Sequence, residues 1–234
     1  VSFAPAVNYG TGPSPYSGLT ADFNNDGKTD IVTANYNGIN VSALLGSGTG
    51  TFAAAANSAA GPGAYSVFAA DFNGDGNMDL ATANYNSYYV AVLLGSGTGT
   101  FAAAVNYVVG NNPYSVFSAD FDNDGNKDLF ISSGIVKRPV DLDYIRFVSD
   151  LVMKKDGAKT SELDKEAIDN MPEGSSHPYF YKGDGKINFS DVSESWGTGD
   201  MKGYFNGASY ADLDNDGNLD MLINRMDAPA VILK

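Results

Sequence analysis

The chain has 234 residues, and its 28 Asp and Glu against 14 Lys and Arg give a formal net charge of −14 at pH 7. Nucleic acids and anionic membrane surfaces attract basic residues, so this charge argues against both as partners. There is no cysteine, which excludes disulfides and thiolate chemistry, and no apolar run approaches the roughly 20 residues that span a bilayer.

A repeat with a constant offset of 49 residues runs through the chain. The string GSGTGTF occurs at 46–52 and again at 95–101, and Asp22-Phe23 recurs as Asp71-Phe72 and Asp120-Phe121. A fourth acidic copy begins at Asp212, after one further repeat and an insertion of 43 residues. A repeat of this length predicts an array of identical structural units.

Each unit contains four short runs of β-forming residues. In the second unit they are 65–72, 78–85, 88–95 and 100–107, separated by turns rich in Gly and Asn. Four antiparallel strands per repeat are typical of a β-propeller blade. We therefore predict an all-β fold, a single β-propeller domain over 1–234, with four blades at about 11–58, 60–109, 111–197 and 203–234.

Residues 1–9 match 50–58 and 99–107, the outermost strand of the first two units. The segment 230–234 matches a third strand. We expect residues 1–9 to complete the last blade and close the ring. Closure within one chain gives a four-bladed monomer, which needs no partner, and closure between two chains gives an eight-bladed homodimer.

The insertion, 136–178, is predicted to be helical. Leu142, Ile145, Val148 and Leu151 recur at helical spacing, and a second helix is expected over 161–170, between the second and third strands of blade three. Hairpin geometry places this insertion at one end of the blades, and we predict a ligand-binding face there formed by Tyr36, Tyr85, Tyr88 and Tyr89. The alternative is that these tyrosines only cover blade edges.

Four acidic loops, 22–30, 71–79, 120–128 and 212–220, share one pattern. Oxygen-bearing side chains occupy positions 1, 3, 5 and 9, glycine occupies position 6, and position 7 offers its backbone carbonyl. Such hard ligands in a tight loop suit Ca²⁺. The predicted ligands, for four Ca²⁺ per chain, are Asp22, Asn24, Asp26, Lys28, Asp30, Asp71, Asn73, Asp75, Asn77, Asp79, Asp120, Asp122, Asp124, Asn126, Asp128, Asp212, Asp214, Asp216, Asn218 and Asp220.

Two other kinds of loop share part of this acidic pattern. An EF-hand requires Glu at position 12, where this chain has Thr33, Thr82, Ile131 and Ile223. Ordinary Asx turns explain one such loop better than four in register. The similar string at 183–191 lacks upstream ligands and is predicted to be a turn between strands.

These loops, the strands before them and the GSGTGTF hairpin resemble the FG-GAP/VCBS repeat family, which includes the integrin α-subunit propeller, secreted lectins and bacterial surface proteins. The resemblance implies a propeller with Ca²⁺ between the first two strands of each blade, usually with seven blades. Residues 137–234, which contain all four Glu, resemble ASPIC/UnbV-type VCBS proteins. A chimera of two parents is one interpretation of this change, and drift of one blade is the other.

The function predicted from these observations is a calcium-binding, secreted or cell-surface module of bacterial type that binds a glycan or protein without catalysis. One alternative is an engineered or truncated propeller scaffold with no selected ligand. Another is a polysaccharide-active enzyme. His177 is the only histidine, and no hydrolase or phosphate-binding motif is present.

Overall fold

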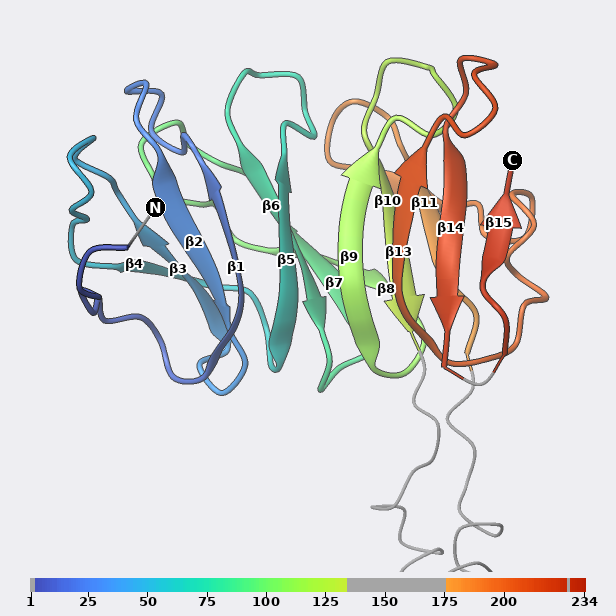
Figure 1. The fold of residues 1–234 in the computed structure, drawn as a ribbon, viewed down its shortest axis with the longest axis horizontal. Coiled ribbons are helices and arrows are strands. Elements are labelled where there is room, and N and C mark those ends of the chain that lie inside the picture. The colour runs from blue at the N-terminus through green and yellow to red at the C-terminus, as the bar shows by residue number, and fades with distance from the viewer. Residues whose placement is uncertain (1–2, 134–175, 227) are drawn as a thin grey trace, which may run out of the picture.

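The computed structural model describes residues 3–133, 176–226 and 228–234. These residues form four antiparallel sheets that stand side by side in chain order (Figure 1). We call the sheets blades one to four. The all-β class and the blade-like repeat predicted from the sequence are confirmed.

In each of the first three blades the strands follow one another in space as in sequence. Blade four has three strands, in the order β13-β14-β15. The bounds are β1 (Pro15–Ala21), β2 (Asp30–Asn35), β3 (Asn40–Leu44) and β4 (Ala56–Ala59) in blade one; β5 (Ala64–Ala70), β6 (Asp79–Asn84), β7 (Tyr89–Leu93) and β8 (Val105–Val108) in blade two; β9 (Pro113–Ala119), β10 (Asp128–Ser133), β11 (Tyr179–Gly183) and β12 (Phe189–Asp191) in blade three; and β13 (Phe205–Ala211), β14 (Asp220–Arg225) and β15 (Val231–Leu233) in blade four.

Alternating side chains on each blade pack against the next blade. Val32 and Ala34 of β2, for example, lie in one apolar cluster with Val67 and Leu80 of blade two. Two further clusters join blade two to three and blade three to four. Because successive residues of a strand point to opposite faces, each central strand supplies both neighbouring interfaces. The core is thus divided into layers between blades.

The first strand of each blade carries a β-bulge at the same place. The register shifts between Pro15 and Ser17, and again between Ala64 and Ser66, so that Tyr16 and Tyr65 are the extra residues. The equivalent shifts leave Tyr114 and Asn206 as the extra residues of blades three and four. A bulge redirects its side chain, and these three tyrosines gather in one aromatic group.

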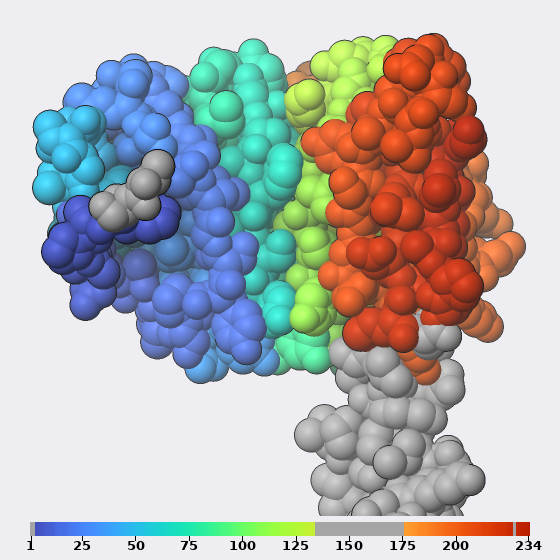
Figure 2. Space-filling model, in the orientation of Figure 1, coloured from blue at the N-terminus to red at the C-terminus, as the bar shows by residue number. Residues whose placement is uncertain are grey.

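Closure of the ring within one chain, one of the two versions predicted from the sequence, is wrong for this structure. Residues 3–14 contain no strand and lie against blade one, and the described part of the chain gives blade four no fourth strand. Residues 1–9 do align with the outer strand of the repeat. The four blades, however, form an open row whose two ends lie apart (Figures 1 and 2). Residues 3–14 therefore cannot reach β15 of the same chain. The two predicted helices lie outside the described residues.

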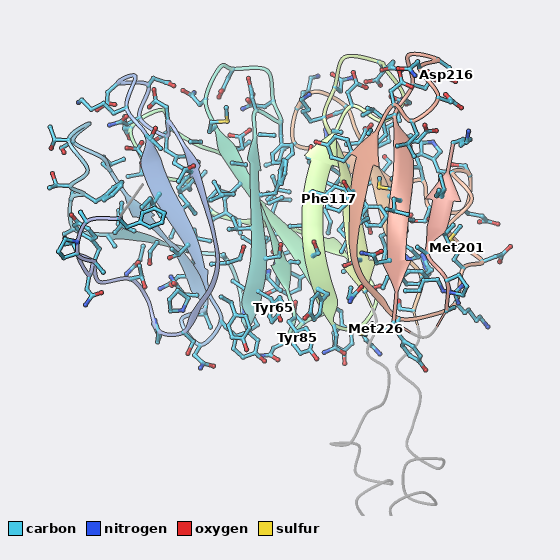
Figure 3. All side chains as sticks on the ribbon, viewed as in Figure 1. Tyr65, Tyr85, Phe117, Met201, Asp216 and Met226 are labelled. Atoms are coloured by element: carbon cyan, nitrogen blue, oxygen red, sulfur yellow. The ribbon has the colours of Figure 1, made fainter. Side chains whose placement is uncertain are left out.

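The two ends of the blades differ in chemistry. Asp216 of the fourth acidic loop lies at one end, and Tyr65 and Tyr85 lie at the other (Figure 3). The string 183–191 contains the end of β11, the turn at 184–188 and β12, so the predicted turn between strands is confirmed. Among the described residues no helix has the length and apolar character needed to cross a membrane.

Candidate metal centre

Each acidic loop connects the first two strands of its blade. In all four, the carboxylate at position 1 accepts the backbone N–H groups of positions 5 and 6. In loop three, Asp120 accepts from Asp124 at 3.0 Å and from Gly125 at 2.9 Å. The carboxylate at position 5 then accepts from position 7, as Asp124 does from Asn126 at 2.8 Å. These bonds wrap the loop around its own carboxylates.

The wrapping requires two left-handed residues per loop. Position 6 is the predicted glycine, with φ of 77° at Gly27 and 90° at Gly125. Position 4 is also left-handed, with φ of 56° at Asn25 and 57° at Asn123. The left-handed conformation at position 4 was not predicted from the sequence. The residue types at position 4 could have indicated it, because all four loops have Asn or Gly there, the residues that tolerate this conformation best.

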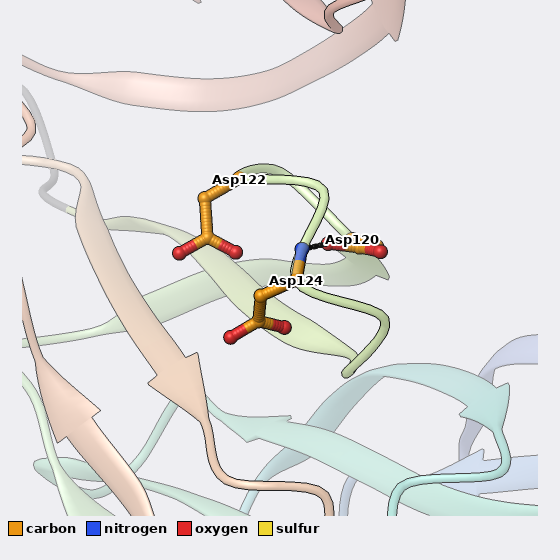
Figure 4. A group of neighbouring side chains, drawn as sticks. All are labelled: Asp120, Asp122 and Asp124. Carbon is orange, nitrogen blue, oxygen red and sulfur yellow. Dashed lines mark hydrogen bonds between the residues drawn. The ribbon is translucent and has the colours of Figure 1, made fainter.

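The carboxylates at positions 1, 3 and 5 converge in loops three and four. Asp120, Asp122 and Asp124 (Figure 4) place one oxygen each within 4.8 Å of one another. Asp212, Asp214 and Asp216 do the same in loop four. Loops one and two have the amides Asn24 and Asn73 at position 3. An all-oxygen set of this kind fits a hard divalent cation such as Ca²⁺.

The aspartate at position 9 has a different setting from the other three positions. Asp79 is fully buried, and its two oxygens accept N–H groups from Phe72 at 2.9 Å and Gly95 at 2.7 Å. Asp30 and Asp128 make the same pair of bonds within their own blades. Each ties its loop to the end of the third strand. Asp128 is outside the converging group of loop three, so its role as a ligand stays a prediction.

Burial and hydrogen bonding shift the pKa of these carboxyls in opposite directions. Desolvation raises the pKa of Asp79 and Asp128 above the ordinary aspartate value, although their backbone partners oppose the rise. At the exposed position 5, a hydrogen bond from Lys28 lowers the pKa of Asp26, and one from Lys182 lowers that of Asp124. Hydrogen bonds from lysine thus favour the ionised form of Asp26 and Asp124, whereas burial disfavours the ionised form of Asp79 and Asp128.

Ammonium groups lie against three of the four loops. Lys182 of β11 contacts both Asp122 and Asp124, the latter at 2.8 Å. Lys28 lies 2.9 Å from Asp26, and Lys234 lies 2.9 Å from Asp214. Lys182 is distant in sequence from loop three, and nothing in the repeat pattern singled it out. These lysines show that the loops attract cations.

Neighbouring loops also contact one another. The Asn25 side-chain amide donates to Asn77 Oδ1 at 2.7 Å, and that of Asn123 donates to Asn218 Oδ1 at 3.1 Å. Position 4 of one loop therefore meets position 7 of the next. The coordination by position 7 carbonyls at Lys28, Asn77, Asn126 and Asn218 remains a prediction.

The predicted ligand tyrosines divide into two groups. Tyr36 and Tyr85 join the bulge residues in a tyrosine row, which we define as Tyr16, Tyr36, Tyr65, Tyr85 and Tyr114. Tyr88 is 63% exposed, and Tyr89 packs against the cluster between blades one and two. The row lies at the end opposite the acidic loops, as hairpin geometry predicted, and its bulge members were missed.

The tyrosine row is linked by ring contacts and hydrogen bonds. Tyr65 and Tyr114 have ring centroids 4.6 Å apart, and the Tyr65 hydroxyl donates to the Tyr114 hydroxyl at 2.9 Å. The Tyr36 hydroxyl donates to Asn86 at 3.0 Å. Burial raises the pKa of Tyr85, and burial together with the Tyr114 hydrogen bond raises that of Tyr65.

The repeated blades with acidic loops define a class of repeat protein, and the family follows from the sequence of those loops. A model of the FG-GAP-like repeat matches residues 22–82 and 71–131. The chain therefore contains FG-GAP-like repeats over residues 22–131, as the sequence resemblance predicted. No curated protein matches the sequence.

Two solved structures resemble the chain at a distance. The Vibrio cholerae biofilm matrix protein Bap1 is 15% identical, with a TM-score of 0.44 over 92% of this chain and 30% of that one. A lectin of Agrocybe aegerita that recognises non-reducing terminal N-acetylglucosamine is 15% identical, with a TM-score of 0.36 over 93% of this chain and 66% of that one. This chain thus spans less than two thirds of either. Similarities this distant identify no shared ligand.

Proposed function

We propose that the chain is a calcium-stabilised extracellular binding module that acts without catalysis. The observation that carries the proposal is the repeated acidic loop, with converging carboxylates in loops three and four. The predicted ligands include 14 loop carboxylates, and four Ca²⁺ would change the formal net charge from −14 to −6. Calcium is available at millimolar levels mainly outside cells, which suits modules with weak sites.

The ligand-binding surface in this proposal is the tyrosine row. Its rings stand side by side at the end of a rigid array, and Tyr16 is 59% exposed. Tyrosine combines an apolar ring with a polar hydroxyl, so it suits the mixed surface of a sugar or of a polar protein. A glycan is the ligand that we favour, and a protein is the alternative outcome.

A glycan array tests the proposal, run with the intact chain in calcium and in excess chelator. We expect selective binding in calcium that weakens at least tenfold in Tyr16→Ala. The control is Tyr210→Ala, which removes a tyrosine that is 37% exposed and lies beside the acidic loop of blade four, away from the row. Binding lost equally in both variants, or unchanged in Tyr16→Ala, would reject the row as the binding surface.

A second candidate function, polysaccharide hydrolysis, is favoured by one cavity. A hollow of about 720 Å³ beside blade three is lined by several acidic residues and the single histidine, including His177, Asp191, Glu194 and Asp200. Hydrolysis of a glycosidic bond by two carboxyl groups requires an acid and a second carboxylate that face each other across a cleft. Release of reducing ends from a polysaccharide, abolished in Glu194→Gln, would replace the non-catalytic proposal by this one.

A further inference from the structure

The outward face of blade four has the composition of an interface between blades. Leu222 on β14 holds the place that the repeat gives to Val32, Ala81 and Phe130 in the first three blades. Those three side chains are fully buried against the following blade, whereas Leu222 is 36% exposed. This face therefore has the composition of an interface between blades, and no described residue covers it.

The neighbouring positions repeat the contrast. Ile232 pairs with Leu222, as Ala43 pairs with Val32. Ala43 is 2% exposed and Ile232 is 54% exposed. Leu213 replaces the buried Phe23 and is 54% exposed, and with Leu222 and Ile232 it lines a small apolar hollow of about 110 Å³. A contiguous patch of exposed apolar side chains, such as that of Leu213, Leu222 and Ile232, marks an interaction surface.

Within the ranges that the structure describes, no outer strand pairs with β15 of blade four. In blade one, β3 pairs with β2 on one side and β4 on the other. In blade four, β15 pairs with β14 alone. An unpaired edge next to an apolar face is a template for another strand.

The opposite end of the row carries the complementary features. Residues 3–10 have the sequence phase of an outer strand, and Phe3 corresponds to Phe52, which bridges to Gly46 at the end of its own blade's third strand. Phe3 and Val7 are 101% and 71% exposed. Tyr9 meets Phe52 of blade one edge to face, in the geometry by which Tyr107 of the outer strand β8 meets Phe189 of the next blade. The segment thus sits where the outer strand of a preceding blade belongs.

We propose that the β15 edge and outward face of blade four bind the N-terminal segment and first blade of a second copy of this chain. Two copies joined in this way at both ends form a closed ring of eight blades, which lies within the usual range of about four to eight. The joint continues the interface already repeated between the blades. It needs a second copy because the two complementary ends of one chain lie at opposite ends of its row (Figure 2).

The repeat fixes the register of this joint. Ala43 pairs with Ala56 and Val92 with Val105, so Ile232 of one copy lies opposite Val7 of the other. Charge supports the same arrangement. Lys28 holds position 7 of the first loop, the position that meets the preceding loop, and in the ring it faces the carboxylates of loop four.

A cysteine cross-link tests the proposal, and the natural chain contains no cysteine. The intact chain carrying Val7→Cys and Ile232→Cys is oxidised and analysed without reductant. We expect a covalent dimer, and light scattering of the unmodified chain should give twice 24.6 kDa. The control pair Asn8→Cys and Ile232→Cys shifts the register by one residue and points the side chains to opposite faces, so its yield should be at least fivefold lower.

A second pair of variants covers failure of the cross-linked chain to fold. Leu222→Asp should convert the dimer to a monomer with unchanged circular dichroism, whereas Ile39→Asp, at a residue 60% exposed in a turn, should leave the mass unchanged. A monomeric unmodified chain, an intramolecular cross-link, or a ladder of larger oligomers would each overturn the two-chain ring. None of these measurements depends on calcium binding or on a ligand.

Discussion

Tyr9 and Phe52 meet edge to face, with ring centroids 5.3 Å apart and an interplanar angle of 84°. Tyr107 and Phe189 repeat the contact at 5.3 Å and 82° between blades two and three. The same pair therefore recurs at a complete interface and at the open start of the row. It fixes the N-terminal segment to blade one.

Replacing Tyr9 tests this attachment. Tyr9→Ala should lower the free energy of unfolding by about 1 kcal/mol, the typical worth of an aromatic pair, and should make residues 3–14 more sensitive to protease. Urea unfolding and timed proteolysis measure the two effects. Tyr88→Ala, outside these contacts, serves as the control. Equal behaviour of the two variants would show that the ring contact does not hold the segment.

The buried aspartate at position 9 should stabilise the blades even without metal. Asp79→Ala leaves the N–H groups of Phe72 and Gly95 without their acceptor, at a cost of about 2 to 4 kcal/mol. Urea unfolding in excess chelator measures this cost. Asp75→Ala, at an exposed position of the same loop, should unfold like the unmodified chain there while weakening calcium binding. Equal stability of both variants in chelator would contradict the structural role.

Lys182 should weaken calcium binding at loop three. Its ammonium contacts Asp122 and Asp124, so an entering cation must displace or tolerate it. Lys182→Met should tighten the site roughly fivefold, which corresponds to about 1 kcal/mol of screened charge interaction. Titration calorimetry measures the change against Lys202→Met, which removes the same charge from an exposed position. A weaker site in Lys182→Met would show that the lysine instead orders the loop.

Stability should fall at alkaline pH. Burial raises the folded-state pKa of Tyr85, Tyr107 and Tyr181 above the ordinary value of 10.0. The unfolded chain then ionises first, so this stabilisation is complete below about pH 10 and is lost as the pH rises further. The urea midpoint should drop as the pH rises from about 10 upward, with a smaller drop in Tyr85→Phe. A midpoint that is constant or rises over this range would contradict the assigned burial.

The sequence predicted what local repetition determines. The acidic loops, the glycine at position 6 and the four-strand unit depend on residues close in sequence, and the structure confirms them. Lys182 was missed because only the pairing of β11 with β10 brings it to loop three. The roles of Tyr16, Tyr65 and Tyr114 were missed because a bulge, invisible in the alternating pattern, redirects them. The prediction of closure within one chain was wrong because the position of a segment in the repeat does not determine the distance between the two ends of the chain.

The calcium content of the purified chain tests the central claim most directly. Native mass spectrometry after removal of metal and return of Ca²⁺ should show four ions per chain, and the melting temperature should rise with calcium by mass action. Removing one loop at a time, as in Asp26→Ala or Asp216→Ala, should remove one ion each, with loop four binding more tightly because it has an extra carboxylate. A chain that takes up no calcium, and melts at the same temperature with Ca²⁺ and with chelator, would contradict the account.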